Sequence, residues 1–102
     1  MQARVARYRI EPERCEEAVA SFKEAGAEIS KLEGFRDGYV LVDPDDGDIL
    51  TITVWDSHAS LDASEMKATS SRRRAAEAVD GTVEAVSRYG VAVELTPTPG
   101  GY

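Results

Sequence analysis

Hydrophobic and polar side chains alternate along residues 49–55, which read Ile-Leu-Thr-Ile-Thr-Val-Trp. Successive side chains of a strand point to opposite faces, so this segment is predicted to be a strand with two usable faces. The aliphatic face carries Leu50, Ile52 and Val54. The mixed face carries Thr51, Thr53 and Trp55. We expect the mixed face to form the floor of a pocket and the aliphatic face to need a cover.

The first third of the chain predicts a strand followed by a helix. In residues 3–10, the positions Ala6, Tyr8 and Ile10 alternate with Val5, Arg7 and Arg9. Pro12 then suits the first turn of a helix, and Gly34 is expected to end that helix. Its apolar stripe repeats at spacings of three and four residues: Cys15, Ala18, Val19, Phe22, Ala25, Ile29 and Leu32.

Residues 35–43 alternate again and are predicted to pair with residues 49–55 as a hairpin. The connection, Pro-Asp-Asp-Gly at residues 44–47, has the composition of a tight turn. Within the first strand of the hairpin, Val40 and Val42 are assigned to one face and Tyr39 to the other. The turn shares its aspartates with calcium loops, but the glycine position and the missing glutamate do not fit one, so no metal is expected.

A second helix is predicted to begin after Asp56 or Ser57, either of which can cap it. Leu61 and Met66 are expected to point inward. The hydroxyl residues 69–71 are expected to interrupt this helix, because such side chains compete for backbone hydrogen bonds.

A second helical piece is predicted at residues 72–79. The alternating residues 83–95 then predict a long last strand. Residues 96–102 are expected to form a flexible C-terminal tail after a single domain at residues 1–95.

The order strand, helix, strand, strand, helix, strand predicts an α+β fold of the ferredoxin-like βαββαβ type, with an antiparallel sheet and both helices on one face. The other face is expected to carry Leu50, Ile52, Val54, Val40 and Val42. Each such side chain left in water loses about 1.5–3 kcal/mol of the free energy that its burial would contribute. An exposed apolar patch of this size is typical of an interface. A homodimer with the two sheets face to face is therefore predicted.

Composition and charge limit the partners and the location that are expected for this protein. The 102 residues carry a formal net charge of −7, which disfavours nucleic acid and anionic lipid as partners. The single Cys15 cannot form an intrachain disulfide, and no apolar run approaches a membrane span or a signal peptide, so a cytoplasmic location is expected. Arginines gather at Arg4, Arg7 and Arg9 and at residues 72–74, and each cluster is interpreted as a solvated face.

Three segments carry a resemblance to a known family. They are Gly34-Phe35, residues 38–42 (Gly-Tyr-Val-Leu-Val) and residues 50–57 (Leu-Thr-Ile-Thr-Val-Trp-Asp-Ser), with Ala59 and Leu61 following. This pattern, spread over residues 3–95, resembles the antibiotic biosynthesis monooxygenase-like (ABM) family of dimeric α+β barrels. The motifs are more specific for the fold than for an activity, because this fold hosts unrelated functions.

The resemblance implies a cavity between the sheet and its helices and a cofactor-free monooxygenase that acts on quinols or aromatic polyketides. A branch of the superfamily degrades haem with a first-strand asparagine, a tryptophan on the second helix and a histidine further along that helix. This sequence contains no asparagine, has serine near the tryptophan position and reads Ser-Ser-Arg-Arg-Arg where the histidine is expected. Haem degradation is therefore not expected, and no cofactor is predicted.

A cofactor-free oxygenase needs a dry pocket and groups that favour a phenolate. His58 is the candidate base, because its unperturbed pKa lies near neutrality, and Arg72 is the candidate counter-charge. Candidate substrate-binding residues are Trp55, Thr53, Thr51, Tyr39, Tyr8, Ser64 and Met66. Each also has a structural interpretation, as a core or surface residue.

Two further classes of function stay open: a non-catalytic homodimer that binds a small apolar ligand, and a regulatory ferredoxin-like module. A cavity with converging polar groups would favour chemistry. A cavity filled by Leu61, Met66 and Phe22 would favour a structural role.

Overall fold

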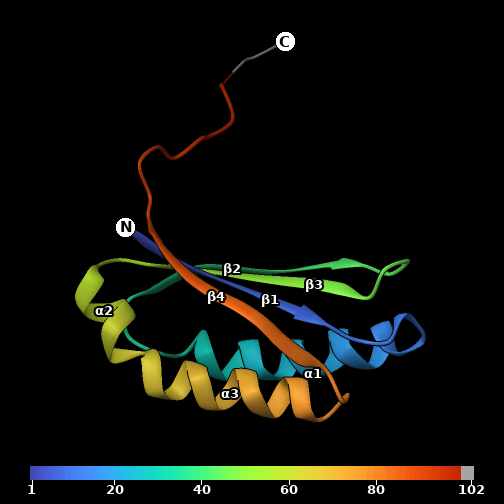
Figure 1. The fold of residues 1–102 in the computed structure, drawn as a ribbon. Coiled ribbons are helices and arrows are strands. Elements are labelled where there is room, and N and C mark those ends of the chain that lie inside the picture. Colours follow the sequence, from blue (N-terminus) through green and yellow to red (C-terminus); the bar gives the residue numbers. More distant parts are fainter. Residues whose placement is uncertain (100–102) are drawn as a thin grey trace.

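The computed structural model describes residues 1–99, which form a sheet and a layer of helices (Figure 1). The strands are β1 (Gln2–Arg9), β2 (Phe35–Asp43), β3 (Asp48–Trp55) and β4 (Thr82–Gly90). The helices are the short 3₁₀ turn η1 (Pro12–Arg14), α1 (Cys15–Ile29), α2 (His58–Ala63) and α3 (Glu65–Glu77).

The four strands form one antiparallel sheet in the order β2-β3-β1-β4, and the helices lie on one of its faces (Figure 1). The two connections that contain helices link strands lying apart in the sheet, and the β2–β3 hairpin links neighbours. This is the α+β ferredoxin-like arrangement, so the predicted fold class is confirmed.

The η1 turn that starts at Pro12 leads into α1, which buries Cys15, Ala18, Phe22 and Ile29. Val19, which was assigned to the same stripe, is 39% exposed. Each residue turns the helix by about 100°, and that rotation carries the side chain after Ala18 past the buried side.

The register of the hairpin overturns one predicted face assignment. Pairs on the side that the helices cover are Val40 with Thr51 and Val42 with Ile49. Pairs on the opposite side, the open face, are Tyr39 with Ile52 and Leu41 with Leu50. The prediction that Val40 and Val42 share a face with Leu50, Ile52 and Val54 is therefore wrong.

The physical reason for that error is that both faces of β2 are apolar. Alternation inside a strand separates its two faces but does not say which one meets the aliphatic face of the partner. A register shift between Phe35 and Asp37 also places Phe35 on the helix side, opposite Trp55.

The second helical region breaks earlier than the hydroxyl residues suggested. The side chain of Ser57 accepts a hydrogen bond from the backbone N–H of Ser60 at 3.1 Å, which caps α2 as predicted. The chain changes direction at Ser64, and residues 69–71 lie inside α3. This earlier break leaves Met66 87% exposed, so the expected inward position is wrong.

Two groups of buried side chains hold the helices to the sheet. The larger one joins β1 and β3 to α1 and α3 and includes Ala6, Tyr8, Ile10, Phe22, Ile49 and Val79. The smaller one consists of Ile29, Trp55, Leu61 and Ala68, with Leu32 and Phe35 against it. The second group lies where α2 meets the end of β3.

The last strand is shorter than predicted. β4 ends at Gly90, whereas residues 91–98 have no regular secondary structure and project from the sheet (Figure 1). Within this segment Val93 is 72% and Leu95 is 90% exposed. Of the predicted tail, residues 100–102 lie outside the described residues. Among residues 1–99, no helix combines the length and hydrophobicity needed to cross a membrane.

Candidate functional site

A pocket of about 410 Å³ lies between the helices and the sheet. Its walls come from β1, β2, β3, the second half of α1, and α3. Both groups of buried residues border it, since Tyr8 and Phe22 of the larger group and Ile29 of the smaller one line it. Ligand sites in proteins have volumes of roughly 300–1,000 Å³, so the pocket suits a small molecule.

Tyr8 presents a phenol group to this pocket from the middle strand β1. Its hydroxyl lies 3.1 Å from Oγ1 of Thr51 on β3, and its ring packs at 4.5 Å against the ring of Phe22. Burial raises the pKa of Tyr8, while the Thr51 hydroxyl and the charges of Arg72 and Arg4 oppose that rise. The side chain is therefore a neutral phenol near pH 7 that can donate a hydrogen bond.

Arg4 lines the same pocket and is only 4% exposed. Its Nη2 donates to the backbone oxygen of Leu61 at 3.1 Å, to Oγ of Ser64 at 3.1 Å and to Oε2 of Glu65 at 2.6 Å. Its guanidinium lies 5.9 Å from the centre of the Trp55 ring, within cation–π range. Burial lowers the pKa of Arg4, and the hydrogen bond that Arg4 donates to Glu65 opposes this effect.

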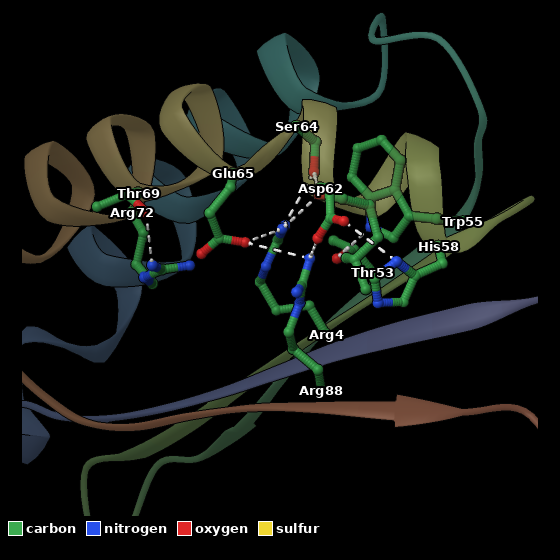
Figure 2. Close-up of polar contacts among 11 residues, drawn as sticks. Arg4, Thr53, Trp55, His58, Asp62, Ser64, Glu65, Thr69, Arg72 and Arg88 are labelled. Atoms are coloured by element: carbon green, nitrogen blue, oxygen red, sulfur yellow. Dashed lines mark hydrogen bonds and ion pairs between the residues drawn. The ribbon is translucent and has the colours of Figure 1, made fainter.

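A chain of charged side chains continues outward from Arg4 (Figure 2). Arg88 of β4 lies 3.8 Å from Glu65 and 2.6 Å from Asp62. Asp62 in turn lies 3.1 Å from Nδ1 of His58, whose side chain is 69% exposed. His58 therefore lies at the outer end of this network and not in the pocket.

Trp55 is fully buried behind the pocket and is not one of its lining residues. Its Nε1 donates a hydrogen bond of 3.0 Å to Oγ1 of Thr53, which does line the pocket. The Phe35 ring meets the indole edge to face at 5.5 Å. Trp55 acts on the pocket by orienting Thr53 and by supporting Arg4.

The structure brings together five of the residues that the sequence proposed for the site. The lining residues among them are Tyr8, Thr51, Thr53, Arg72 and Tyr39. Of the three consecutive arginines, only Arg72 lines the pocket. Tyr39 stands at the rim on β2, and its partner in the register, Ile52, lies on the open face.

The other proposed residues lie elsewhere. Ser64 is buried and binds Arg4, and Trp55 lies behind Thr53. Met66 and His58 point outward. The pocket is not filled by Leu61 and Met66, because Leu61 packs in the smaller buried group and Met66 is exposed.

Arg4 was missed as a site residue, because the arginines of the first strand were interpreted as a solvated face. The buried position of Arg4 could have been predicted from the sequence. Arg4 is in phase with Ala6 and Tyr8 in the alternation of β1, whereas Arg7 and Arg9 are out of phase. A charged side chain on the buried face of a strand needs polar partners, and this pattern is typical of a functional position.

No cluster of three or more histidine, cysteine, aspartate or glutamate side chains that could hold a metal ion occurs within residues 1–99. Cys15 is buried, and its Sγ lies 3.9 Å from the backbone oxygen of Pro44. The polar side chains that line the pocket are arginines, a lysine, hydroxyls, two phenols and the carboxylate of Asp37, and its cations can bind and orient an organic anion.

Solved structures share this fold over nearly the whole chain. A Deinococcus radiodurans protein whose name places it with the antibiotic biosynthesis monooxygenases has a TM-score of 0.76 at 13% identity, covering 96% of this chain and 99% of its own. SnoaB, a cofactor-independent oxygenase from Streptomyces nogalater, has a TM-score of 0.72 at 20% identity, with coverages of 94% and 97%. A conserved protein from Methanosarcina mazei has a TM-score of 0.68 at 22% identity, with coverages of 86% and 89%.

The amino-acid sequence has no match among curated proteins. The family model described as antibiotic biosynthesis monooxygenase matches residues 1–78, which contain β1 to α3 and every residue that lines the pocket. The chain therefore belongs to the antibiotic biosynthesis monooxygenase (ABM) family.

Proposed function

We propose that this protein is a cofactor-independent monooxygenase that acts on a small electron-rich aromatic molecule, such as a quinol or a polyketide-like phenol. One observation carries the proposal. The phenol of Tyr8, the hydroxyl of Thr51 and the guanidinium groups of Arg4 and Arg72 meet in one otherwise largely apolar pocket. Family membership and the likeness in fold to SnoaB, a cofactor-independent oxygenase, support it.

In such a reaction the substrate itself supplies the electrons. An anthrone-type substrate loses a proton to give an anion, which transfers electrons to dioxygen and forms a carbon–oxygen bond. One oxygen atom stays on the carbon as a carbonyl group and the other leaves as water. The CH₂ carbon provides all the electrons, so no external reductant is required.

The protein contributes charge and hydrogen bonds to this sequence. Arg4 stabilises the anion, because a nearby positive charge favours the ionised form of an acidic group. Tyr8, kept neutral by its raised pKa, donates a hydrogen bond to the substrate oxygen while Thr51 holds its own hydroxyl in place.

The proposal needs no dedicated base. Asp37 is the single carboxylate among the lining residues, and it lies on the exposed part of β2. Lowering the pKa of the bound substrate with Arg4 and the Tyr8 hydroxyl lets water accept the proton. His58, the base suggested by the sequence, is outside the pocket and has no part in this step.

The same proposal includes a homodimer formed through the open face. Leu50, Ile52 and Val54 lie on that face and are only partly buried within one chain, and Leu41 beside them is 47% exposed. A second copy of the sheet would cover these side chains, because two sheets pack face to face at about 10 Å. Val40 and Val42 have no part in this interface.

Oxygen consumption with a panel of anthrones and hydroquinones tests the activity. We expect turnover in air, none under argon, and incorporation of one atom from ¹⁸O₂ into the product of an anthrone. The Arg72→Gln variant should lower kcat/KM at least tenfold, whereas Arg73→Gln on the exposed side of α3 should change it less than twofold. Quenching of Trp55 fluorescence by the panel without any oxygen uptake would instead support a non-catalytic binding protein.

A further inference from the structure

Cations outnumber carboxylates among the residues that line the pocket, although Arg4 pairs with Glu65 and Arg36 pairs with Asp56. Four of its lining residues, Arg4, Lys23, Arg36 and Arg72, are cations, whereas Asp37 is the only carboxylate among them. The whole chain has a formal net charge of −7. An acidic protein that concentrates positive charge in one cavity offers a local attraction for anions there.

Arg4 has one buried nitrogen whose hydrogen-bond donor lacks a partner. Its three hydrogen bonds to protein all leave from Nη2, and its Nε is buried with no acceptor. A buried N–H without a partner is costly, and native structures seldom tolerate one unless a ligand or water completes it. The Nε is sealed from solvent and from the pocket, so the partly exposed Arg72 is the cation of this pair that stays open to a ligand.

Arg72 has an unneutralised charge. Its one hydrogen bond to protein runs from Nη2 to Oγ1 of Thr69 at 3.2 Å, and no carboxylate of residues 1–99 lies within 4.0 Å of its guanidinium. By contrast, Arg74, two residues further along α3, forms an ion pair of 2.9 Å with Glu28. Arg72, Arg4 and Tyr8 all line the pocket, and the charge of Arg72 lowers the pKa of both other groups.

A neutral aromatic molecule would remove water from the charged group of Arg72 and provide no hydrogen-bond acceptor in return. The substrate anion of the proposed reaction forms only after binding and therefore does not compensate that loss when the complex forms. A carboxylate is ionised before it binds, and its planar pair of oxygens matches the fork of a guanidinium.

We propose that the substrate carries a carboxylate, separate from the group that is oxidised, and that Arg72 binds this carboxylate, which leaves Arg4 and Tyr8 beside the group that is oxidised. The inference rests on the proposed function only in taking the same pocket as the substrate site. It assigns the substrate class as an aromatic carboxylate, and it makes Arg72 a determinant of specificity.

Two product-like probes that cannot be oxidised test this inference without turnover: anthraquinone-2-carboxylate and its neutral carboxamide. Binding is followed by the quenching of Trp55 fluorescence and by calorimetry. We expect the carboxylate to bind wild type at least tenfold more tightly than the carboxamide, and this preference should shrink as salt is added.

The matched variants are Arg72→Gln and Arg73→Gln, which remove the same charge from neighbouring positions of α3. The preference for the carboxylate should fall below twofold in Arg72→Gln and stay at tenfold in Arg73→Gln. Arg72→Lys keeps the positive charge but loses the paired donors of the guanidinium, so it should retain part of the preference for the carboxylate. Circular dichroism confirms that each variant is folded.

Equal affinity of wild type for the two probes overturns the inference, as does binding of neither probe or an equal loss of preference in both glutamine variants. If wild type binds the two probes equally but turns over a neutral anthrone, the proposed function stands and only the inferred carboxylate of the substrate is wrong. If the carboxylate preference is found without oxygen uptake, the inference stands and the oxygenase is wrong.

Discussion

Arg4 on β1 and Glu65 at the start of α3 form an ion pair of 2.6 Å that joins the sheet to the helical layer (Figure 2). The arginine is 4% exposed and the glutamate side chain is 44% exposed. The pair therefore connects a cation inside the pocket wall to the protein surface. It keeps the most deeply placed charge of the pocket ionised and in one orientation.

Replacing Glu65 by glutamine should lower the free energy of unfolding by about 1–2 kcal/mol. The buried guanidinium then keeps only neutral acceptors, and the partial exposure of Glu65 limits the loss. Urea denaturation followed by Trp55 fluorescence measures this change. Glu77→Gln, on the exposed side of the same helix, is the control and should stay within 0.5 kcal/mol, as surface substitutions of about that size usually do. Equal stability of the two variants would show that the pair contributes nothing.

The raised pKa of Tyr8 predicts a loss of stability at alkaline pH. Folding favours the neutral phenol, so its contribution is intact below the unfolded pKa of about 10 and decreases as the pH rises through the folded pKa. Between those two values the slope from this one group approaches about 1.4 kcal/mol per pH unit. Urea midpoints at pH 9 and pH 11 should therefore fall less in Tyr8→Phe than in wild type. Tyr89→Phe, with an exposed ring, should follow wild type.

A lysine placed on one face of the hairpin should disrupt the proposed dimer, whereas a lysine on the other face should not. Ile52→Lys places a charge on the open face and should convert the proposed dimer to a monomer at micromolar concentration. Val42→Lys places the same charge on the helix side near the edge of the sheet, where the side chain is already 39% exposed, and should leave the dimer intact. Sedimentation velocity separates the outcomes, and a wild-type monomer would remove the interface altogether.

His58 should be dispensable for the proposed oxidation. Its side chain contacts Asp62 outside the pocket and is 69% exposed, so His58→Ala should leave kcat/KM within a factor of two. Tyr8→Phe should lower the same quantity about tenfold, because it removes the hydroxyl that lies beside Thr51. A large loss in His58→Ala, seen as an acidic limb missing from the pH profile, would restore histidine as the base.

Two glycines should respond to alanine in opposite directions. Gly34 has a φ of 85°, and an added Cβ would meet the side chain of Ser60, so Gly34→Ala should destabilise the fold by about 1–3 kcal/mol. Gly26 lies inside α1 with open space where its Cβ would be, and Gly26→Ala should stabilise by about 0.5–1 kcal/mol. Thermal melting of the two variants compares them directly, with wild type expected between them.

The site was partly predictable from the alternation of the strands. Thr51 and Thr53 were proposed because the period-2 pattern places them on the mixed face, Tyr8 was proposed as a hydrogen-bonding aromatic residue, and the structure puts all three in the pocket wall. The helical residues were less predictable. Met66 and Arg72 are both on α3, and which of them faces the pocket depends on where the helix restarts, at Ser64, which no local preference indicated.

The amino-acid sequence by itself determined the element order, the fold class and the aliphatic composition of the open face, since these follow from local periodicity and turn residues. Only the tertiary structure decided the rest. The register of β2 against β3 moved Val40 to the pocket side and placed Tyr39 at the pocket rim, paired with Ile52 of the open face, because pairing is a relation between two strands. Packing of α2 and α3 on β1 likewise buried Arg4 beside Glu65, since a charge enters a core only where partners from distant elements meet it.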